Sequence, residues 1–402
     1  MYDFIIPREY GFVKRETLEI ASEIATKEGN EIIYERDFPL VVPKEEKKPQ
    51  ANRLQAWQDH KAASAKIAAK MLSVHYLYKR KMRKAFDSGN DLEGWDLMQT
   101  AAKFYERSQR MYNCANFVLH GKCPDCGRTH TSSAMLCRDR VCPTCAWRLS
   151  LQQAVEMQQT LAYINDIDQY KAAFLTLTLR NCEIPDLKGT LERMATAWNR
   201  LLQRKQPKAL FKGWARRVEI TYNAKARTFH PHYHLIILMP AASAPSAYDA
   251  HEMLRSLWKS ALRIDYDPVT DFTYIEDLTA GGMDSDATPD LHKAILETFK
   301  YTIKDDAMAD MPLECFRHFV DAIQGKRLTA YGGVIKDARQ GFGFGDDLDE
   351  QTPQGACADC RNPLLQRVIY RWSFQSKTYE RFEQINTATA ADLIRKPRKT
   401  DA

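Results

Sequence analysis

The chain has 402 residues, enough for two or three domains, and its 44% hydrophobic and 27% charged residues are the proportions of an ordinary globular protein. The formal net charge of +6 permits a polyanionic partner but does not require one. No apolar run approaches the roughly 18 residues that a membrane-spanning helix needs, so no membrane segment is expected.

The first residues, "MYDFIIPREYGFVKRE", lack the basic region and apolar core of a secretory signal. We therefore expect a cytoplasmic protein whose ten cysteines stay reduced. In a reducing compartment, paired cysteines usually bind a metal ion rather than form disulfides.

Five regions are predicted along the chain. Residues 1–50 show weak periodicity and end in the charged stretch "VVPKEEKKPQ", which indicates a variable N-terminal segment. Residues 51–113 are mostly strong helix formers, and their basic run "YKRKMRK" is either a solvated helix face or a face that lies along phosphates. Cysteine pairs mark a module over 114–150, a mixed domain follows over 165–345, and 346–402 is a C-terminal extension.

The mixed domain alternates helical and strand periodicity. Only about six polar residues, "NAKART", separate two of its strands, which is hairpin length, so this pair is antiparallel. The fold class predicted is therefore α+β, an antiparallel sheet with flanking helices. Strands are predicted over 172–180, 215–223, 229–239 and 271–277, with shorter ones over 327–336 and 367–374, and helices over 146–164, 187–205, 247–263 and 289–306.

The strand "FHPHYHLIILM" contains three histidines at alternate positions. Alternate side chains of a strand project from one face, so His230, His232 and His234 share a face while Tyr233 points into a core. Two imidazoles at i and i+2 can bind one metal ion. His230 begins the strand and is the reserve ligand.

The neighbouring strand offers a third ligand. If the hairpin turns midway through "NAKART", Glu219 lies directly opposite His232 on the same face, whereas a slip of two residues would favour Thr221 or Arg217. Two histidines and one carboxylate leave coordination positions open, as in a catalytic metal site. Mg²⁺ or Mn²⁺ suits a phosphate substrate, and zinc or iron remains an alternative.

The stretch "LHKAILETFKYTIKDD" (291–306) has helical periodicity. Glu297, Tyr301 and Lys304 are spaced to lie on one helix face. A tyrosine hydroxyl can attack phosphorus covalently, with a lysine to stabilise charge and a carboxylate as general base. This spacing is common on solvated helices, so by itself it does not indicate a catalytic site. It supports one only together with the histidine strand.

Taken in order, "FLTLTLRN" (174–181), "HPHYHLIIL" (230–238) and "KYTIK" (300–304) resemble the three motifs of rolling-circle plasmid replication initiators, single-tyrosine members of the HUH endonuclease superfamily. The resemblance covers about 120 to 340. It implies an antiparallel sheet, a divalent ion on His232 and His234, and a glutamate before the histidine motif similar to Glu219. Tyr301 would be the nucleophile that nicks one DNA strand at the origin and leaves a 5′-phosphotyrosine and a 3′-OH primer. Glu297 would activate water, and Lys304 would contact phosphate.

The cysteines "CPDC" (123–126) and "CPTC" (142–145) have zinc-ribbon spacing. The predicted structural Zn²⁺ ligands are Cys123, Cys126, Cys142 and Cys145. Cys137 could replace one of these four ligands, and His120 or His130 is close enough in the sequence to compete with them for the ion. "RVCPTC" also resembles a segment that these initiators carry before their first motif. A second zinc on Cys357 and Cys360, with Cys315 and His318, is a weaker alternative.

Two other functions remain open. One is a relaxase or single-tyrosine transposase with the same chemistry, and the other is a zinc-dependent DNA-binding regulator that does not catalyse. The sequence has no G-x-x-x-x-G-K-[ST] motif, so no ATPase of its own is expected. The expected partners are origin DNA and the host helicase, polymerase and single-strand-binding protein.

Overall fold

The computed structural model describes residues 53–127, 129–164, 167–275, 291–345 and 366–382. The chain divides into two compact units, each described by itself here. Of the described residues, the first contains those from 150 to 345, and the second contains those from 53 to 149 and from 366 to 382. The helical region, the cysteine module and the C-terminal strands thus belong to one unit.

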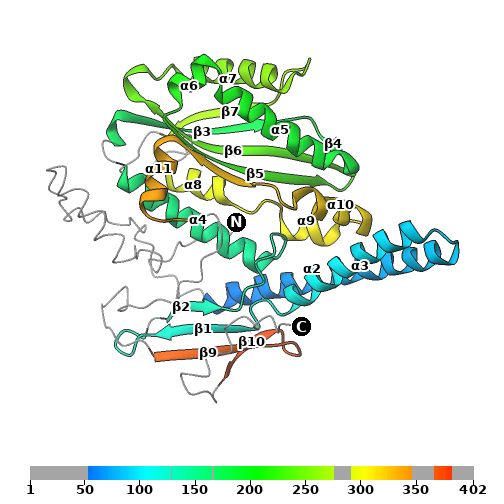
Figure 1. Cartoon of the computed structure of the whole chain (residues 1–402). Coiled ribbons are helices and arrows are strands. Elements are labelled where there is room, and N and C mark those ends of the chain that lie inside the picture. The colour runs from blue at the N-terminus through cyan, green and yellow to red at the C-terminus, as the bar shows by residue number, and fades with distance from the viewer. Residues whose placement is uncertain (1–52, 128, 165–166, 276–290, 346–365, 383–402) are drawn as a thin grey trace. The chain divides into compact units, whose positions relative to one another are not determined.

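The first unit is built on a six-stranded antiparallel sheet in the order β7-β3-β6-β5-β8, with β4 paired to β6 (Figure 1). This arrangement confirms the α+β class and the antiparallel sheet. The strands are β3 (Tyr170–Thr178), β4 (Cys182–Glu183), β5 (Gly213–Asn223), β6 (Thr228–Pro240), β7 (Thr270–Ile275) and β8 (Thr329–Gly332).

Helices cover both faces of this sheet. On one face, Ile236 and Leu238 of β6 belong to an apolar core with residues of α4, α8 and α11. On the other, Tyr233 packs against Trp198 of α5 and Trp258 of α7. The helices are α4 (Pro143–Tyr163), α5 (Leu187–Leu202), α6 (Lys205–Leu210), α7 (Ala247–Leu262), α8 (Leu291–Phe299), α9 (Asp305–Asp310), α10 (Leu313–Ile323) and α11 (Gly333–Gly341), with 3-10 turns at Ile167–Gln169, Ile184–Asp186 and Ala241–Ser243.

The β5–β6 hairpin has the register that its loop length predicted. The side-chain oxygen of Asn223 accepts hydrogen bonds from the backbone N–H groups of Lys225 and Ala226, each at 3.0 Å, and this Asx turn reverses the chain. Asn223 then pairs with Thr228, and Glu219 pairs with His232. The predicted register is confirmed, and the alternatives that slip by two residues are excluded.

Two predicted elements differ from the structure. The helix predicted over 289–306 is observed only as α8, which ends at Phe299. The strand predicted over 327–336 is divided between β8 and α11, because Gly333 has a left-handed backbone (φ +57°) that turns the chain out of the sheet. Sequence periodicity also missed the short helices α6, α9 and α10.

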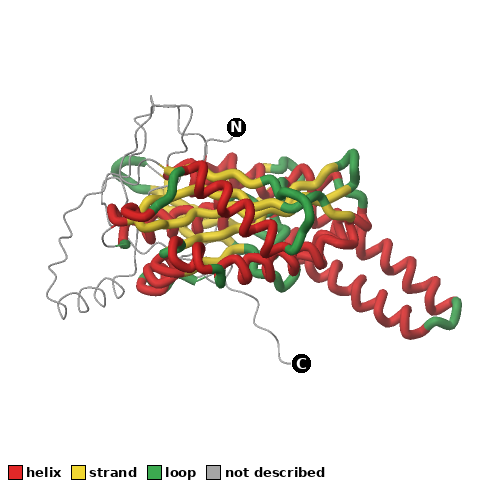
Figure 2. The backbone as a smooth tube through the Cα atoms, turned by 90° about the horizontal axis from the view of Figure 1, so that it is seen from above, coloured by secondary structure: helices red, strands yellow, loops and turns green. Residues whose placement is uncertain are grey.

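The second unit joins a helical hairpin to a four-stranded antiparallel sheet. The helices α2 (Arg53–Asp87) and α3 (Asp91–Tyr112) run side by side, as Figure 2 shows, and confirm the predicted helical region. Asn90 caps α3 by accepting a hydrogen bond from the Glu93 backbone. The sheet has the order β10-β9-β1-β2. Its strands are β1 (Phe117–Lys122), β2 (Thr129–Ala134), β9 (Gln366–Ser373) and β10 (Thr378–Phe382).

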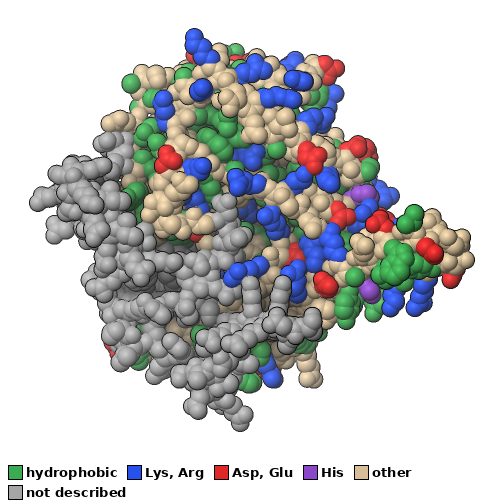
Figure 3. Space-filling model, in the orientation of Figure 1, with side chains coloured by type: hydrophobic (Ala, Val, Ile, Leu, Met, Phe, Trp, Pro, Cys, Tyr) green, Lys and Arg blue, Asp and Glu red, His purple; other side chains and the backbone are tan. Residues whose placement is uncertain are grey.

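The surface of the described residues is mixed. Lys and Arg side chains are spread over much of the face shown in Figure 3, and apolar side chains gather near the free end of the α2–α3 hairpin. Leu92 and Trp95, close to the turn of that hairpin, are exposed. Among the helices that the structure describes, none has the length and hydropathy that crossing a membrane requires.

Candidate metal centre and tyrosine segment

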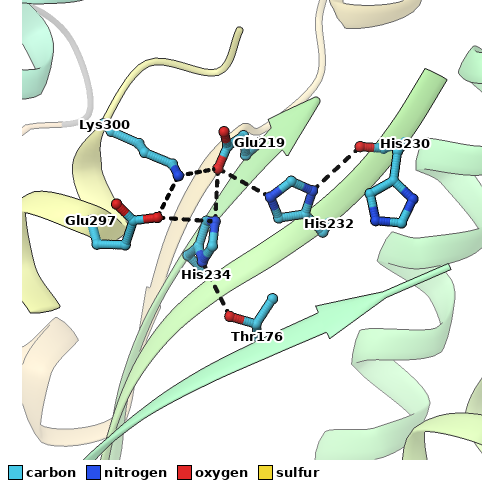
Figure 4. A network of polar contacts seen from close by, with 7 residues as sticks. All are labelled: Thr176, Glu219, His230, His232, His234, Glu297 and Lys300. Atoms are coloured by element: carbon cyan, nitrogen blue, oxygen red, sulfur yellow. Dashed lines mark hydrogen bonds and ion pairs between the residues drawn. The ribbon is translucent and has the colours of Figure 1, made fainter. Parts of the chain in front are cut away.

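The histidine strand and its neighbour bring three candidate ligands together. Cross-strand pairing sets Glu219 of β5 opposite His232 of β6. The Oε2 atom of Glu219 lies 3.0 Å from His232 Nε2 and 2.7 Å from His234 Nε2 (Figure 4). One ligand atom from each residue lies within 4.8 Å of the other two, so the group has the dimensions of a metal site.

The donor chemistry of this group fits a cation. His232 Nδ1 lies 3.3 Å from the His230 carbonyl oxygen, which can only accept, so this contact is a hydrogen bond in the tautomer that carries its proton on Nδ1. In that tautomer the Nε2 lone pair is free to bind a cation, whereas in the other tautomer Nε2 donates a hydrogen bond to Glu219. A cation shared by Glu219 and the two Nε2 atoms would take the place of the hydrogen bonds between these rings and the carboxylate.

His234 is the more firmly held imidazole. It is buried, it stacks on the Phe174 ring at a centroid distance of 5.5 Å, and its Nδ1 lies 3.3 Å from Thr176 Oγ1. In the tautomer in which Nδ1 donates to the threonine, Nε2 is left as the metal-binding atom. This contact to the neighbouring strand β3 fixes the ring orientation, as the outer partners of metal-bound histidines do.

The reserve ligand His230 lies outside the group. Its Nδ1 lies 2.9 Å from the side-chain oxygen of Asn181, and its ring centroid is 5.5 Å from that of His232. Burial, together with the neighbouring His232, lowers the pKa of His230 and favours its neutral form.

Helix α8 and the residue that follows it supply two further charged groups. Lys300 Nζ lies 2.7 Å from Glu219 Oε2 and also pairs with Glu297 Oε1, which lies 3.9 Å from His234 Nε2. Burial opposes ionisation of Glu219, but hydrogen bonds from the two histidines and Lys300 outweigh it and hold its pKa well below the ordinary value. Burial likewise opposes the charge on Lys300, yet its carboxylate partners raise its pKa. Sequence reasoning missed Lys300 as a site residue, although it precedes the tyrosine in the third motif.

The prediction that Glu297, Tyr301 and Lys304 share one helix face is wrong. Helix α8 ends at Phe299, whose carbonyl oxygen accepts a hydrogen bond from Ser150, and Lys304 caps the following helix α9. The chain leaves the helix because Thr302 accepts a backbone hydrogen bond from Ile220 of β5 at 2.7 Å. Strand β8 does not extend as far as Ile220, so this bond gives the Ile220 N–H the acceptor that β8 does not provide.

Tyr301 is therefore in the connection between α8 and α9 and not in a helix. The residues on either side of it both contact β5, since Lys300 pairs with Glu219 and Thr302 accepts from Ile220. The tyrosine is half-buried. The backbone at Tyr301 consequently runs along the strand that carries the glutamate of the histidine group.

Four cysteine sulfurs form a second group, in the second unit. Its members are Cys114, Cys137, Cys142 and Cys145. The Sγ atom of Cys145 lies 3.5 Å from that of Cys114 and 3.6 Å from that of Cys137. Sulfurs at the corners of a tetrahedral zinc site are about 3.8 Å apart. The backbone N–H groups of Cys137 and Arg138 donate hydrogen bonds to Sγ atoms of the group. Backbone N–H groups donate to zinc-bound thiolates in the same way.

This group differs from the predicted zinc ligands. Cys142, Cys145 and the substitute Cys137 belong to it, but Cys123 and Cys126 do not, because they lie after β1, in the connection to β2. Cys114, directly after α3, completes the group instead, although it belongs to no C-x-x-C pair. His120 is buried within β1 and is not a member, and the side chain of His130 is not described. Cys357 and Cys360 also lie outside the described residues.

Comparisons with known proteins identify the family of this chain. The replication protein family matches residues 128–380. "Protein rep" of Bacillus amyloliquefaciens is 30% identical over 67% of this chain and 83% of its own length. "Protein rep" of a Bacillus species is 29% identical over 62% and 85%, and "Protein rep" of Streptococcus pneumoniae is 28% identical over 58% and 71%. No solved structure matches the chain.

The family match spans the histidine strand, the tyrosine segment and three of the four clustered cysteines. It leaves out Cys114 and the whole helical hairpin, whose second helix ends at Tyr112. The chain belongs to the replication protein family, and this membership indicates a plasmid replication initiator.

Proposed function

We propose that this initiator is a metal-dependent DNA-nicking endonuclease and strand transferase. The observation that carries the proposal is the convergence of two imidazole Nε2 atoms, from His232 and His234, on one oxygen of Glu219. A connection that contains Tyr301 runs along the same strand as this glutamate. The pairing of a metal centre with a half-buried tyrosine suits transfer of a phosphodiester to a phenol.

The residues His232, His234 and Glu219 would hold Mg²⁺ or Mn²⁺. When bound, such an ion withdraws charge from a nonbridging oxygen of the scissile phosphate. The chain contributes the orientation, since strands β5 and β6 fix the ligands and the Thr176 contact fixes the His234 ring.

Tyr301 is the proposed nucleophile. Its phenolic oxygen forms a bond to phosphorus, the bond from phosphorus to the 3′-oxygen breaks, and the departing oxygen takes a proton. The products are a 5′-phosphotyrosine and a 3′-OH that can prime synthesis. Because the phosphotyrosine conserves the energy of the broken bond, a later 3′-OH can reverse the step and rejoin the strands.

Glu297 and Lys304 have supporting roles in this proposal. The Glu297 carboxylate, 3.9 Å from His234, can take a proton from the phenol or from a water that ends the round by hydrolysis. Lys304 is exposed at the start of α9 and would contact a phosphate of the strand.

Zinc is the proposed ion of the four-cysteine group, where it would brace the second unit. The ion would join the end of α3 to the start of α4, because Cys114 follows α3 and Cys145 lies within α4. A closed set of four thiolates is typical of a structural rather than a catalytic site.

The proposed substrate is the plasmid origin, single-stranded at the nick. Because the sequence has no nucleoside-triphosphate loop, unwinding would require a host helicase, and a host polymerase and single-strand-binding protein would act with it. A relaxase or transposase would use the same chemistry on another substrate. A regulator that does not catalyse would bind DNA without cutting it.

The test is incubation of the full chain with a supercoiled plasmid that carries its own gene region, plus Mn²⁺ or Mg²⁺. We expect a nicked circle with protein attached to its 5′ end. Tyr301→Phe should reduce nicking at least about a thousandfold and leave DNA binding unchanged. Tyr248→Phe is the matched control, because Tyr248 is 74% exposed on α7. Nicking that survives in Tyr301→Phe would exclude this tyrosine as the nucleophile.

A further inference from the structure

A cavity of about 500 Å³ lies on the face of the central sheet opposite the histidines. Its walls come from α5, from β5 and β6, and from the chain that leads into β8. Side chains of a strand alternate, so Arg216 of β5 points to this cavity while its neighbours Arg217 and Ala215 point to the histidine face. The lining residues that matter here are Trp198, Trp214, Arg216, Tyr233, Lys326 and Arg327.

Arg216 is a buried cation without an anionic partner. Its side chain is only 5% exposed, and its Nε and Nη1 atoms have no hydrogen-bond partner. Within the part of the chain that the structure describes, no carboxylate forms an ion pair with it. The indole N–H of Trp198, on the same cavity wall, also has no acceptor. Buried charges are normally paired, so this arrangement indicates a place for an acceptor.

Aromatic rings hold the guanidinium but do not neutralise it. It lies 4.3 Å from the centroid of the Tyr233 ring and 5.8 Å from that of Trp198. Cation–π contacts of this kind engage the flat face of the group and leave its N–H edge to bind an anion. Burial lowers the pKa of Arg216, as expected when a charge is removed from water.

The rim of the cavity is also basic. Arg327 is exposed there, and Lys326 pairs with Glu192 of α5 at 2.5 Å. Three cations against one carboxylate give the cavity a positive potential, which favours anions. Trp214 adds a partly exposed aromatic surface. Cavities of roughly 300–1,000 Å³ take a small molecule, so this one has more room than a bare phosphate needs.

We infer that this cavity binds a nucleoside monophosphate unit, with the phosphate at Arg216 and Arg327 and the base against the aromatic wall. A phosphate beside stacking aromatic rings is the combination by which proteins hold single nucleotides of a strand. The unit is either a free nucleotide or one nucleotide of a bound single strand. The inference is independent of nicking, because its residues face away from the histidines.

The experiment is calorimetric titration of the full chain with dTMP, thymidine and inorganic phosphate. We expect dTMP to bind more tightly than either of the other two, since it alone provides both the phosphate and the base. Arg216→Gln should weaken dTMP binding at least about tenfold, as removal of a charged hydrogen-bond donor does. Lys225→Gln removes the same charge from the exposed hairpin and should change the affinity less than about twofold.

Two further variants keep the test decisive. Arg327→Gln changes only the exposed rim, so it should fold even if Arg216→Gln does not, and it should also weaken dTMP binding. Tyr248→Phe should bind dTMP as the wild type does, because Tyr248 is exposed on α7 and does not line the cavity. Displacement of dTMP by a short single-stranded oligonucleotide would assign the cavity to the DNA strand, and failure to displace it would assign a free nucleotide. Absence of dTMP binding, binding that the arginine variants do not weaken, or equal affinity for phosphate would overturn the inference.

Discussion

The ammonium group of Lys300 lies 2.7 Å from Oε2 of Glu219, the oxygen on which His232 and His234 also converge. The lysine therefore holds a positive charge beside the position that a divalent cation would take. A metal ion bound there must share Glu219 with this ammonium group or displace it toward Glu297, its second partner.

The first prediction concerns this competition. Lys300→Met removes a like charge a few ångströms from the metal position, so Mn²⁺ should bind about tenfold more tightly, after allowance for the lysine's partial exposure. Lys304→Met should change Mn²⁺ affinity less than about twofold, because Lys304 is exposed at the start of α9. Titration of each variant with Mn²⁺ measures both. Weaker binding in Lys300→Met would show that the lysine orders Glu219 rather than competing for it.

The second prediction distinguishes the two possible sets of zinc ligands. Cys114→Ser should lower the zinc content by about one ion per chain, because it removes a corner of the four-sulfur group. Cys126→Ser should retain the wild-type content, since Cys126 is exposed and outside that group. Plasma emission spectroscopy on the purified variants provides the measurement. If Cys126→Ser loses zinc and Cys114→Ser keeps it, the ion is bound by the ligands predicted from C-x-x-C spacing.

The third prediction tests the turn between β8 and α11. A Cβ atom on Gly333 would lie 1.9 Å from the carbonyl oxygen of Lys212, and its φ of +57° already disfavours a side chain. Gly333→Ala should therefore cost about 3 kcal/mol or more in the free energy of unfolding. Gly325→Ala is the control, with a similar φ of +70° and open space around it, and should cost only about 1–2 kcal/mol. Urea unfolding compares them, and equal losses would contradict the clash.

The fourth prediction concerns alkaline pH. The buried Tyr379 hydroxyl donates a hydrogen bond to the Ala115 carbonyl oxygen at 2.5 Å, and burial, with nearby Cys114 and Cys142, raises its pKa well above the ordinary value. The unfolded chain ionises this tyrosine near pH 10 while the folded chain does not, so its contribution is complete below about pH 10 and is lost as the pH rises.

Tyr379→Phe should accordingly be about 1 kcal/mol less stable than the wild type at pH 8, because the carbonyl loses its donor. The difference should shrink, by up to about 1.4 kcal/mol per pH unit, as the pH passes 10. Denaturant unfolding from about pH 8 to 11 measures this change. Tyr248→Phe, at an exposed position, should follow the wild type throughout. A constant difference would mean that Tyr379 ionises in the folded protein as it does in the unfolded chain.

The sequence by itself determined the histidine side of the site. Period-2 alternation sets His232 and His234 on one face of β6, and a turn midway through the short "NAKART" loop predicts the register that brings Glu219 opposite His232, which the structure confirms over a slip of two residues. Both features are local, because a strand and its hairpin partner are adjacent in the chain. The α+β class follows from the same antiparallel pair and its flanking helical segments.

Only the tertiary structure decided where helix α8 ends, that Cys114 joins the sulfur group, and that Arg216 is buried with no carboxylate partner among the described residues. Helical periodicity continues through Tyr301, but the backbone donor of Ile220 on β5 required an acceptor, and Thr302 provides it. Such requirements arise between segments far apart in the chain. They depend on which backbone and polar groups are left to be satisfied once the layers pack, and a periodic pattern within one segment carries no information about them.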